Sequence, residues 1–147
     1  MRSLYNYIIS TNSRYDNKVS VGSKELILNT EITERDYLFV NRIGTVINAP
    51  INIKTPIESG NEVIVHHNVF RRWYDVRGNE RNSGNYIKED TYTVSEEQIF
   101  AYKQNGKWHC PIQYCFVEPL ENKDVWSTDS EQKLIGKLTY TNDYLSS

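Results

Sequence analysis

The run Ile43-Gly44-Thr45-Val46-Ile47-Asn48 and, after a Pro-bearing linker, the run Ser59-Gly60-Asn61-Glu62-Val63-Ile64-Val65 decide the fold of this chain. Both runs are short and rich in β-branched residues, and each contains a glycine near its start, which is typical of strands that follow turns. Two such strands joined by a bend suit a small β-barrel that carries its function in its loops. We therefore expect an all-β fold.

Composition indicates a folded chain with a thin core. At 147 residues, one domain with a small appendage is expected. The hydrophobic share of 38% is low, but eleven Tyr and three Trp are more aromatic residues than a disordered chain carries. Long polar loops around a small barrel account for both properties.

Charge and cysteine usage narrow the class of protein further. The net charge of −2 gives no attraction to nucleic acid or anionic membranes. No apolar run approaches the roughly eighteen residues of a membrane span, and the first ten residues lack a signal-peptide pattern. Cys110 and Cys115 are too few for a disulfide framework, so we expect free thiols and a cytoplasmic location.

Turn signals divide the rest of the chain into short strands. Residues 12–24 are polar without periodicity and predict a long loop, and residues 75–90 predict an exposed hairpin or excursion. Ser95-Glu96-Glu97-Gln98 has capping-box spacing and predicts one helical turn, while Asn105-Gly106 predicts a hairpin turn. The absence of any long 3.6-residue apolar stripe favours a barrel or sandwich.

An internal echo suggests a repeat. Leu134-Ile135-Gly136-Lys137-Leu138-Thr139 is similar to Arg42-Ile43-Gly44-Thr45-Val46-Ile47. Each is preceded by a β-prone run, Cys115-Phe116-Val117 in one case and Tyr7-Ile8-Ile9 in the other. We therefore expect a β-barrel over residues 1–104 and a β extension over 105–147 that forms an incomplete second unit.

The order of these elements resembles the co-chaperonin GroES (chaperonin-10) family over roughly residues 5–103. Arg42-Ile43-Gly44-Thr45-Val46 is similar to the family's R-G-x-V strand, and Gly60-Asn61-Glu62-Val63-Ile64-Val65 to its G-D-x-V-x-F strand. The run from Lys88 to Ala101 is similar to its acidic turn and following strand. Asn61 replaces the usual Asp, and the excursion at 70–88 is longer than in the family, which suits a divergent member encoded by a virus such as a phage.

The resemblance implies a GroES-like, partly open barrel that acts as the lid of a chaperonin ring and assists protein folding. A mobile loop over about 12–28 would bind the ring through Leu26, Ile27 and Leu28, with Gly22 and Ser23 giving the loop its freedom. The partner would be a GroEL-like chaperonin, and the chain would form a homo-oligomer, a heptamer by resemblance. No cofactor, metal or catalytic residue is implied.

Other interpretations remain open at this stage. The aliphatic triplet could be a buried strand under an ordinary loop, and the barrel could serve as a viral structural or adaptor domain. Arg71, Arg72, Trp73 and Tyr74, with Arg77 and Arg81, could stack on single-stranded nucleic acid. In the alternative, the arginines pair with Asp75, Glu80 and Glu89 in an exposed hairpin. His66 and His67 on one strand would point to opposite faces and could not share a metal. No catalytic motif is present, so an enzyme is not expected.

Overall fold

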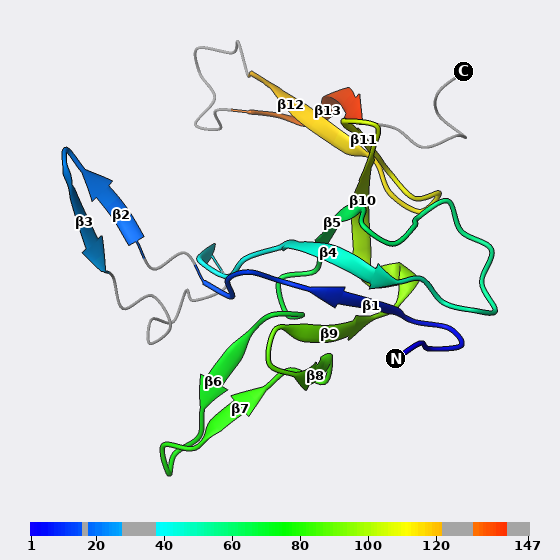
Figure 1. Ribbon diagram of the computed structural model, residues 1–147. Coiled ribbons are helices and arrows are strands. Elements are labelled where there is room, and N and C mark those ends of the chain that lie inside the picture. The colour runs from blue at the N-terminus through cyan, green and yellow to red at the C-terminus, as the bar shows by residue number, and fades with distance from the viewer. Residues whose placement is uncertain (16–17, 28–37, 122–130, 141–147) are drawn as a thin grey trace.

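The computed structural model describes residues 1–15, 18–27, 38–121 and 131–140, and in this part the chain is almost entirely β-structure (Figure 1). Seven strands form one antiparallel sheet in the order β11-β10-β5-β4-β1-β9-β8. These strands are β1 (Tyr7–Ser10), β4 (Ile43–Asn48), β5 (Glu62–Val65), β8 (Tyr86–Lys88), β9 (Thr91–Val94), β10 (Ile99–Gln104) and β11 (Lys107–His109). The predicted all-β class is confirmed.

The two runs that decide the fold form the neighbouring strands β4 and β5. Val46, Val63 and Val65 are buried, and exposed or half-buried residues alternate with them, as expected of strands with one face on a core. Gly44 is required by close packing, because a Cβ atom there would lie 3.0 Å from the carbonyl oxygen of Ser10 and 3.1 Å from the Phe70 ring. The first glycine thus permits β1 and β4 to approach the core.

The core is small and lies along the middle of the sheet. Tyr92 and Phe70 are fully buried at its centre, with their rings edge-to-face and their centroids 4.8 Å apart. The remaining fully buried side chains of the sheet come from β1, β4, β5, β9 and β10, as expected of a chain with a low hydrophobic share: Tyr7, Ile9, Val46, Val63, Val65, Val94 and Ile99.

The sheet is open rather than closed into a barrel. Its edge strands are β8 and β11, and within the described residues neither pairs on its outer side. The sheet also continues past the expected boundary at residue 104, because β11 pairs with β10 through the Asn105-Gly106 turn. Both turn residues have positive φ, +51° and +76°, as a type I′ hairpin requires, so this turn prediction is confirmed. The predicted single helical turn is present as the 3₁₀ helix Glu96–Gln98.

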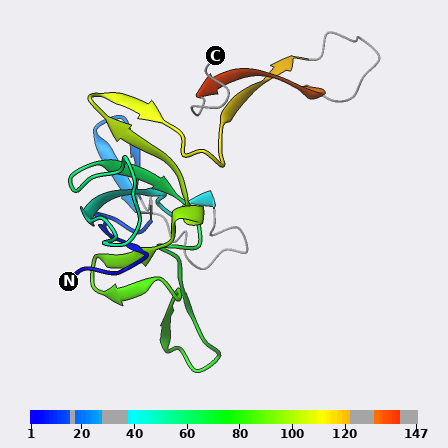
Figure 2. The same ribbon diagram turned by 90° about the vertical axis from the view of Figure 1, so that its right-hand side faces the viewer.

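Three hairpins lie outside the sheet (Figures 1 and 2). They are β2 (Lys18–Val21) with β3 (Lys24–Ile27), β6 (Arg72–Tyr74) with β7 (Glu80–Asn82), and β12 (Phe116–Glu121) with β13 (Glu131–Tyr140). The second confirms in part the exposed hairpin predicted over 75–90, because the hairpin spans 72–82 and β8 at 86–88 belongs to the sheet. The first corrects the loop predicted over 12–24, because backbone pairing within a hairpin forms strands even where no core supports them.

The strand pairs β1–β4 and β12–β13 share one pattern of pairing over three residue pairs. In the first, Ile8 is opposite Asn48, Ile9 opposite Val46 and Ser10 opposite Thr45, with an irregularity between Ile8 and Ile9. The second repeats it: Phe116 is opposite Tyr140, Val117 opposite Leu138 and Glu118 opposite Lys137, with an irregularity at the equivalent place and a further one between Pro119 and Glu121. This register agrees with the sequence echo, and it is what a partial second unit requires. The repeat itself stays a prediction.

The described residues contain no helix with the length and hydrophobicity that a membrane crossing needs.

Candidate functional site

The predicted chaperonin-binding residues lie on the hairpin β2–β3, Lys18–Ile27, which we call the arm. Gly22 and Ser23 form its two-residue turn, with Val21 opposite Lys24. Gly22 has a φ of +63°, whereas Ser23 is not among the residues with positive φ, and this combination is the pattern of a type II′ turn. The two residues therefore define a tight turn, and their part in the freedom of the loop stays a prediction.

The arm presents apolar side chains to solvent. Leu26 is 52% exposed and Ile27 81% exposed, so these residues are not a buried strand. Successive strand residues point to opposite faces, so Leu26 lies on one face of the arm and Ile27 on the other. Leu28, the third predicted contact residue, lies outside the described residues.

The arm could bind a partner weakly through these side chains. Full burial of one Leu or Ile side chain contributes about 1.5–3 kcal/mol, so one arm that buries both gains only a few kcal/mol before it pays for ordering. The Lys18–Glu25 ion pair, 3.4 Å long and exposed on both sides, adds little rigidity. A partner that contacts several arms at once would bind far more tightly than one arm does.

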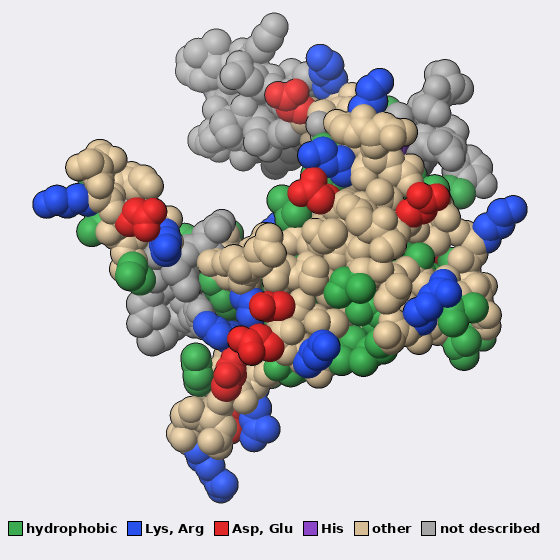
Figure 3. All heavy atoms as spheres, viewed as in Figure 1, with side chains coloured by type: hydrophobic (Ala, Val, Ile, Leu, Met, Phe, Trp, Pro, Cys, Tyr) green, Lys and Arg blue, Asp and Glu red, His purple; other side chains and the backbone are tan. Residues whose placement is uncertain are grey.

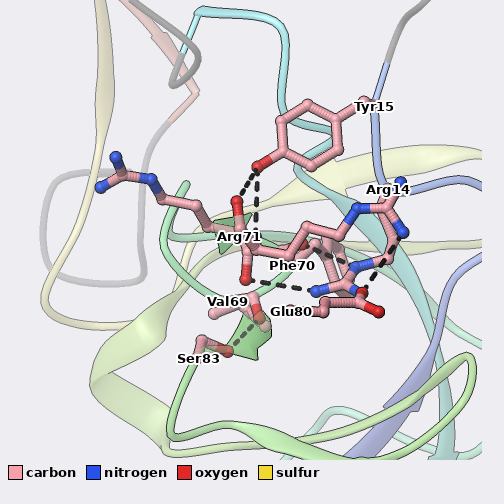
Figure 4. A network of polar contacts seen from close by, with 8 residues as sticks. Arg14, Tyr15, Val69, Phe70, Arg71, Glu80 and Ser83 are labelled. Atoms are coloured by element: carbon pink, nitrogen blue, oxygen red, sulfur yellow. Dashed lines mark hydrogen bonds and ion pairs between the residues drawn. The ribbon is translucent and has the colours of Figure 1, made fainter. Parts of the chain in front are cut away.

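A second set of contacts ties the hairpin β6–β7 to the start of the chain (Figure 4). The Arg14 guanidinium donates from Nε to the Phe70 carbonyl oxygen at 3.0 Å and from a terminal nitrogen to the Arg71 carbonyl oxygen at 3.2 Å. Its other terminal nitrogen lies 3.5 Å from Glu80. Only 14% of the Arg14 side chain is exposed. One arginine therefore joins the two residues before β6 and the first residue of β7 to the start of the chain.

Tyr15 and Ser83 complete this attachment. The Tyr15 hydroxyl donates to the Arg72 carbonyl oxygen at 3.0 Å and accepts from the Arg72 backbone nitrogen at 3.1 Å, so one side chain imitates a strand partner. Ser83 donates to the Val69 carbonyl oxygen at 2.6 Å. Sequence reasoning missed this role of Arg14 and Tyr15, because both lay in the segment predicted to be a loop and their partners are more than fifty residues away.

Acids pair with two of the arginines proposed for nucleic-acid binding. Arg72 lies 3.5 Å from Glu80, and Arg81 lies 3.1 Å from Asp75. Hydrogen bonds from the backbone of Asn79 and then of Arg77 hold the pKa of Asp75 below its ordinary value, so this acid stays charged beside Arg81. The expected pairing with Asp75 and Glu80 is thus observed, whereas in the described part of the chain Glu89 forms no ion pair.

The histidines and cysteines are arranged differently from the prediction. β5 ends at Val65, so His66 and His67 follow the strand, and their rings stack with centroids 4.2 Å apart instead of pointing to opposite faces. The part of the chain that the structure describes contains no cluster of metal-ligating side chains. Cys110 and Cys115 lie between β11 and β12, are free, and are buried and exposed respectively.

No known protein family, curated protein or solved structure matches this chain. Membership of the GroES family therefore stays a prediction from the sequence.

Proposed function

We propose that this chain acts as a co-chaperonin-like lid that binds a chaperonin ring through the arm. The observation that carries the proposal is a hairpin that projects from the sheet and exposes Leu26 and Ile27 at its β3 strand (Figure 1). The order of motifs in the sequence supports it, because the arm falls where the GroES family has its chaperonin-contacting loop. On this proposal the chain acts in the cytoplasm, that of the host cell if a virus encodes it.

The mechanism would be differential binding without chemistry. Exposed aliphatic side chains gain free energy only where a groove on the partner removes them from water. If the groove opens in the nucleotide-bound conformation of the chaperonin, binding of the arm shifts the chaperonin towards that conformation. Several arms on one homo-oligomer, seven by resemblance, would combine weak contacts into stable capping.

The experiment is capture of the untagged chaperonin on the immobilised full chain, with ATP and without. We expect ATP-dependent capture by the wild-type chain and its loss in Leu26→Asp/Ile27→Asp. The matched control is Val76→Asp, because Val76 is a fully exposed aliphatic residue at the turn of the other projecting hairpin, β6–β7. Capture that is equal for all three proteins would refute the assignment of the arm.

The single variants identify the face of the arm that docks. Leu26 and Ile27 lie on opposite faces, so a groove that holds one face is sensitive to one of the two substitutions and tolerant of the other. Equal loss in both single variants indicates instead that the groove encloses the whole hairpin. The native mass of the free chain is measured in parallel, because a stable monomer favours the alternative of a viral structural or adaptor domain over a lid.

A further inference from the structure

A cavity of about 490 Å³ lies where the start of the chain, the hairpin β6–β7 and the β8–β9 turn meet. Its size suits a small organic molecule or one long side chain. Most of its lining is polar or charged, and the residues that the argument uses are Arg14, Arg72, Glu80, Tyr86, Glu89, Asp90 and Tyr92. The cavity is separate from the arm, and the inference does not depend on the proposed function.

The buried wall of the cavity contains an unsatisfied hydroxyl. Tyr92 is fully buried, and its hydroxyl has no hydrogen-bond partner among the described residues. Native structures normally give such a group a partner, either from the protein or from something bound to it. The Tyr92 ring is fixed edge-to-face against Phe70 and Tyr86, at 4.8 and 5.7 Å between centroids, so the hydroxyl cannot swing to another acceptor. Burial raises its pKa, so the hydroxyl stays neutral.

The cationic groups of the cavity are already engaged. Arg14 binds the carbonyl oxygens of Phe70 and Arg71, and both Arg14 and Arg72 lie 3.5 Å from the same oxygen of Glu80. These contacts use one donor on each of the three nitrogens of Arg14, and its guanidinium also lies over the rings of Tyr86 and Tyr92, 5.9 and 5.6 Å from their centroids. The two arginines and Glu80 therefore form a closed structural unit, and they offer little to an incoming anion.

The anionic groups are free. In the described residues, the carboxylates of Glu89 and Asp90 have neither an ion pair nor a side-chain hydrogen bond. The two residues form the two-residue turn between β8 and β9, with Asp90 at a φ of +57° that aspartate tolerates. A backbone bond from Thr11 to the Asp90 carbonyl oxygen, 3.3 Å long, fixes this turn beside the cavity. Figure 3 shows acidic side chains gathered near the base of β6–β7.

We propose that this cavity binds an organic cation, the ammonium or guanidinium group of a polyamine or of a Lys or Arg side chain. Glu89 and Asp90 supply the opposite charge, and the Tyr92 hydroxyl, which is buried in the free protein, accepts a hydrogen bond from the cation once it enters the cavity. A metal ion fits less well, because the described residues contain no cluster of three acidic, His or Cys side chains arranged to hold one.

The test is isothermal titration calorimetry of the full chain at low salt with four probes. Spermidine represents a free polyamine, N-acetyl-arginine amide and N-acetyl-lysine amide represent side chains of a partner, and inorganic phosphate represents an anion. We expect at least one cationic probe to bind with one-to-one stoichiometry. Binding of spermidine alone indicates that the ligand is a free polyamine, and binding of a capped amino acid alone indicates a side chain of a protein partner. Binding of both classes indicates a site for organic cations in general.

Three variants make the assignment specific. Glu89→Gln/Asp90→Asn is expected to weaken binding at least tenfold, whereas Glu58→Gln/Glu97→Gln, which removes the same charge from exposed positions outside the cavity lining, leaves affinity within twofold. Tyr92→Phe is expected to weaken binding several-fold without lowering the melting temperature, because the hydroxyl it removes is unpaired in the free protein.

Three results would overturn the proposal. They are the absence of binding by every cationic probe at millimolar concentration, equal loss of affinity in the two double variants, and binding of phosphate alone. If Tyr92→Phe binds as tightly as the wild type, a water molecule satisfies the hydroxyl and its part in binding is wrong.

Discussion

The arm and the hairpin β6–β7 are both short antiparallel hairpins that project from the sheet, but they are attached in different ways (Figure 1). At the base of β6–β7, Arg14 and Tyr15 hold the backbone of Phe70, Arg71 and Arg72. At the base of the arm, Tyr15 forms an isolated bridge with Val40, and the backbone nitrogen of Asn41 donates to the Arg14 carbonyl oxygen at 2.8 Å. The same short segment, residues 14 and 15, thus anchors one hairpin and precedes the other.

This difference teaches how exposed apolar residues should be interpreted. Trp73 and Tyr74 on β6 are partly exposed, but their strand is fixed by buried polar contacts, so their positions are set before any partner arrives. Leu26 and Ile27 are exposed on a hairpin whose two strands, among the described residues, pair only with each other. Exposed hydrophobic residues on a weakly supported element are expected to gain order as well as burial when a partner binds.

The largest effect is expected from Arg14→Ala, which removes the anchor of β6–β7. It leaves the carbonyl oxygens of Phe70 and Arg71 without their charged donor and should lower the free energy of unfolding by about 3 kcal/mol. Urea denaturation measures the change, and Arg77→Ala in the exposed hairpin turn is the control, expected within about 0.5 kcal/mol of the wild type. If Arg14→Ala and Arg77→Ala have the same free energy of unfolding, Arg14 does not anchor β6–β7, and the proposed difference in how the two hairpins are attached is wrong.

A smaller effect is expected from Tyr15→Phe, which keeps the buried ring and removes only the hydroxyl. Two backbone groups of Arg72 lose their partner, so the free energy of unfolding should fall by about 1.5 kcal/mol. Tyr74→Phe is the matched control, because Tyr74 is 52% exposed, and it should be close to neutral. A neutral Tyr15→Phe would show that water replaces the hydroxyl and that Arg14 alone anchors the hairpin.

The arm is tested by Gly22→Ala, which should act locally. The new side chain meets no atom within 4 Å, so the only penalty is the positive φ, about 1 kcal/mol against the hairpin. Hydrogen exchange at Val21 and Lys24 should accelerate, while the global unfolding midpoint stays unchanged. Gly84→Ala has open space and no positive φ, so its exchange should match the wild type. A drop in global stability with Gly22→Ala would mean that the arm folds as part of the sheet.

The smallest expected effect is a pH dependence confined to the tip of β6–β7. Asp75 accepts hydrogen bonds from the backbone nitrogens of Asn79 and Arg77, each 2.9 Å long, and these lower its pKa in the folded chain. A depressed folded pKa stabilises the turn above the ordinary pKa of aspartate, and this contribution is lost as the pH falls through the lowered value. The Asn79 amide shift in an NMR titration should report the transition. Asp75→Asn should abolish it, and the arm amides should not follow it.

The sequence predicted the strands of the sheet well and the hairpins outside it less well. Val46, Val63 and Val65 recur at the spacing that a buried face imposes, so β4 and β5 were visible as a pattern. The arm residues with a described exposure are all exposed, so the arm has no buried face to impose alternating apolar and polar residues on its strands. Gly22-Ser23 was nevertheless a usable turn signal. Arg14 could not be identified, because its partners depend on how residues 70–80 fold back across the sheet.

The shared register of β1–β4 and β12–β13 has a consequence for how the chain folds. The pairs that the two share enclose residues 11–44 in the first case and residues 119–136 in the second, about 34 and 18 residues. In the unfolded chain, closure of the longer segment costs about 0.6 kcal/mol more. The C-terminal hairpin should therefore pair earlier during refolding than the hairpin at the centre of the sheet. The rates at which β1–β4 and β12–β13 pair during refolding can therefore be compared within one chain, to measure how the length of the enclosed segment affects the rate of strand pairing.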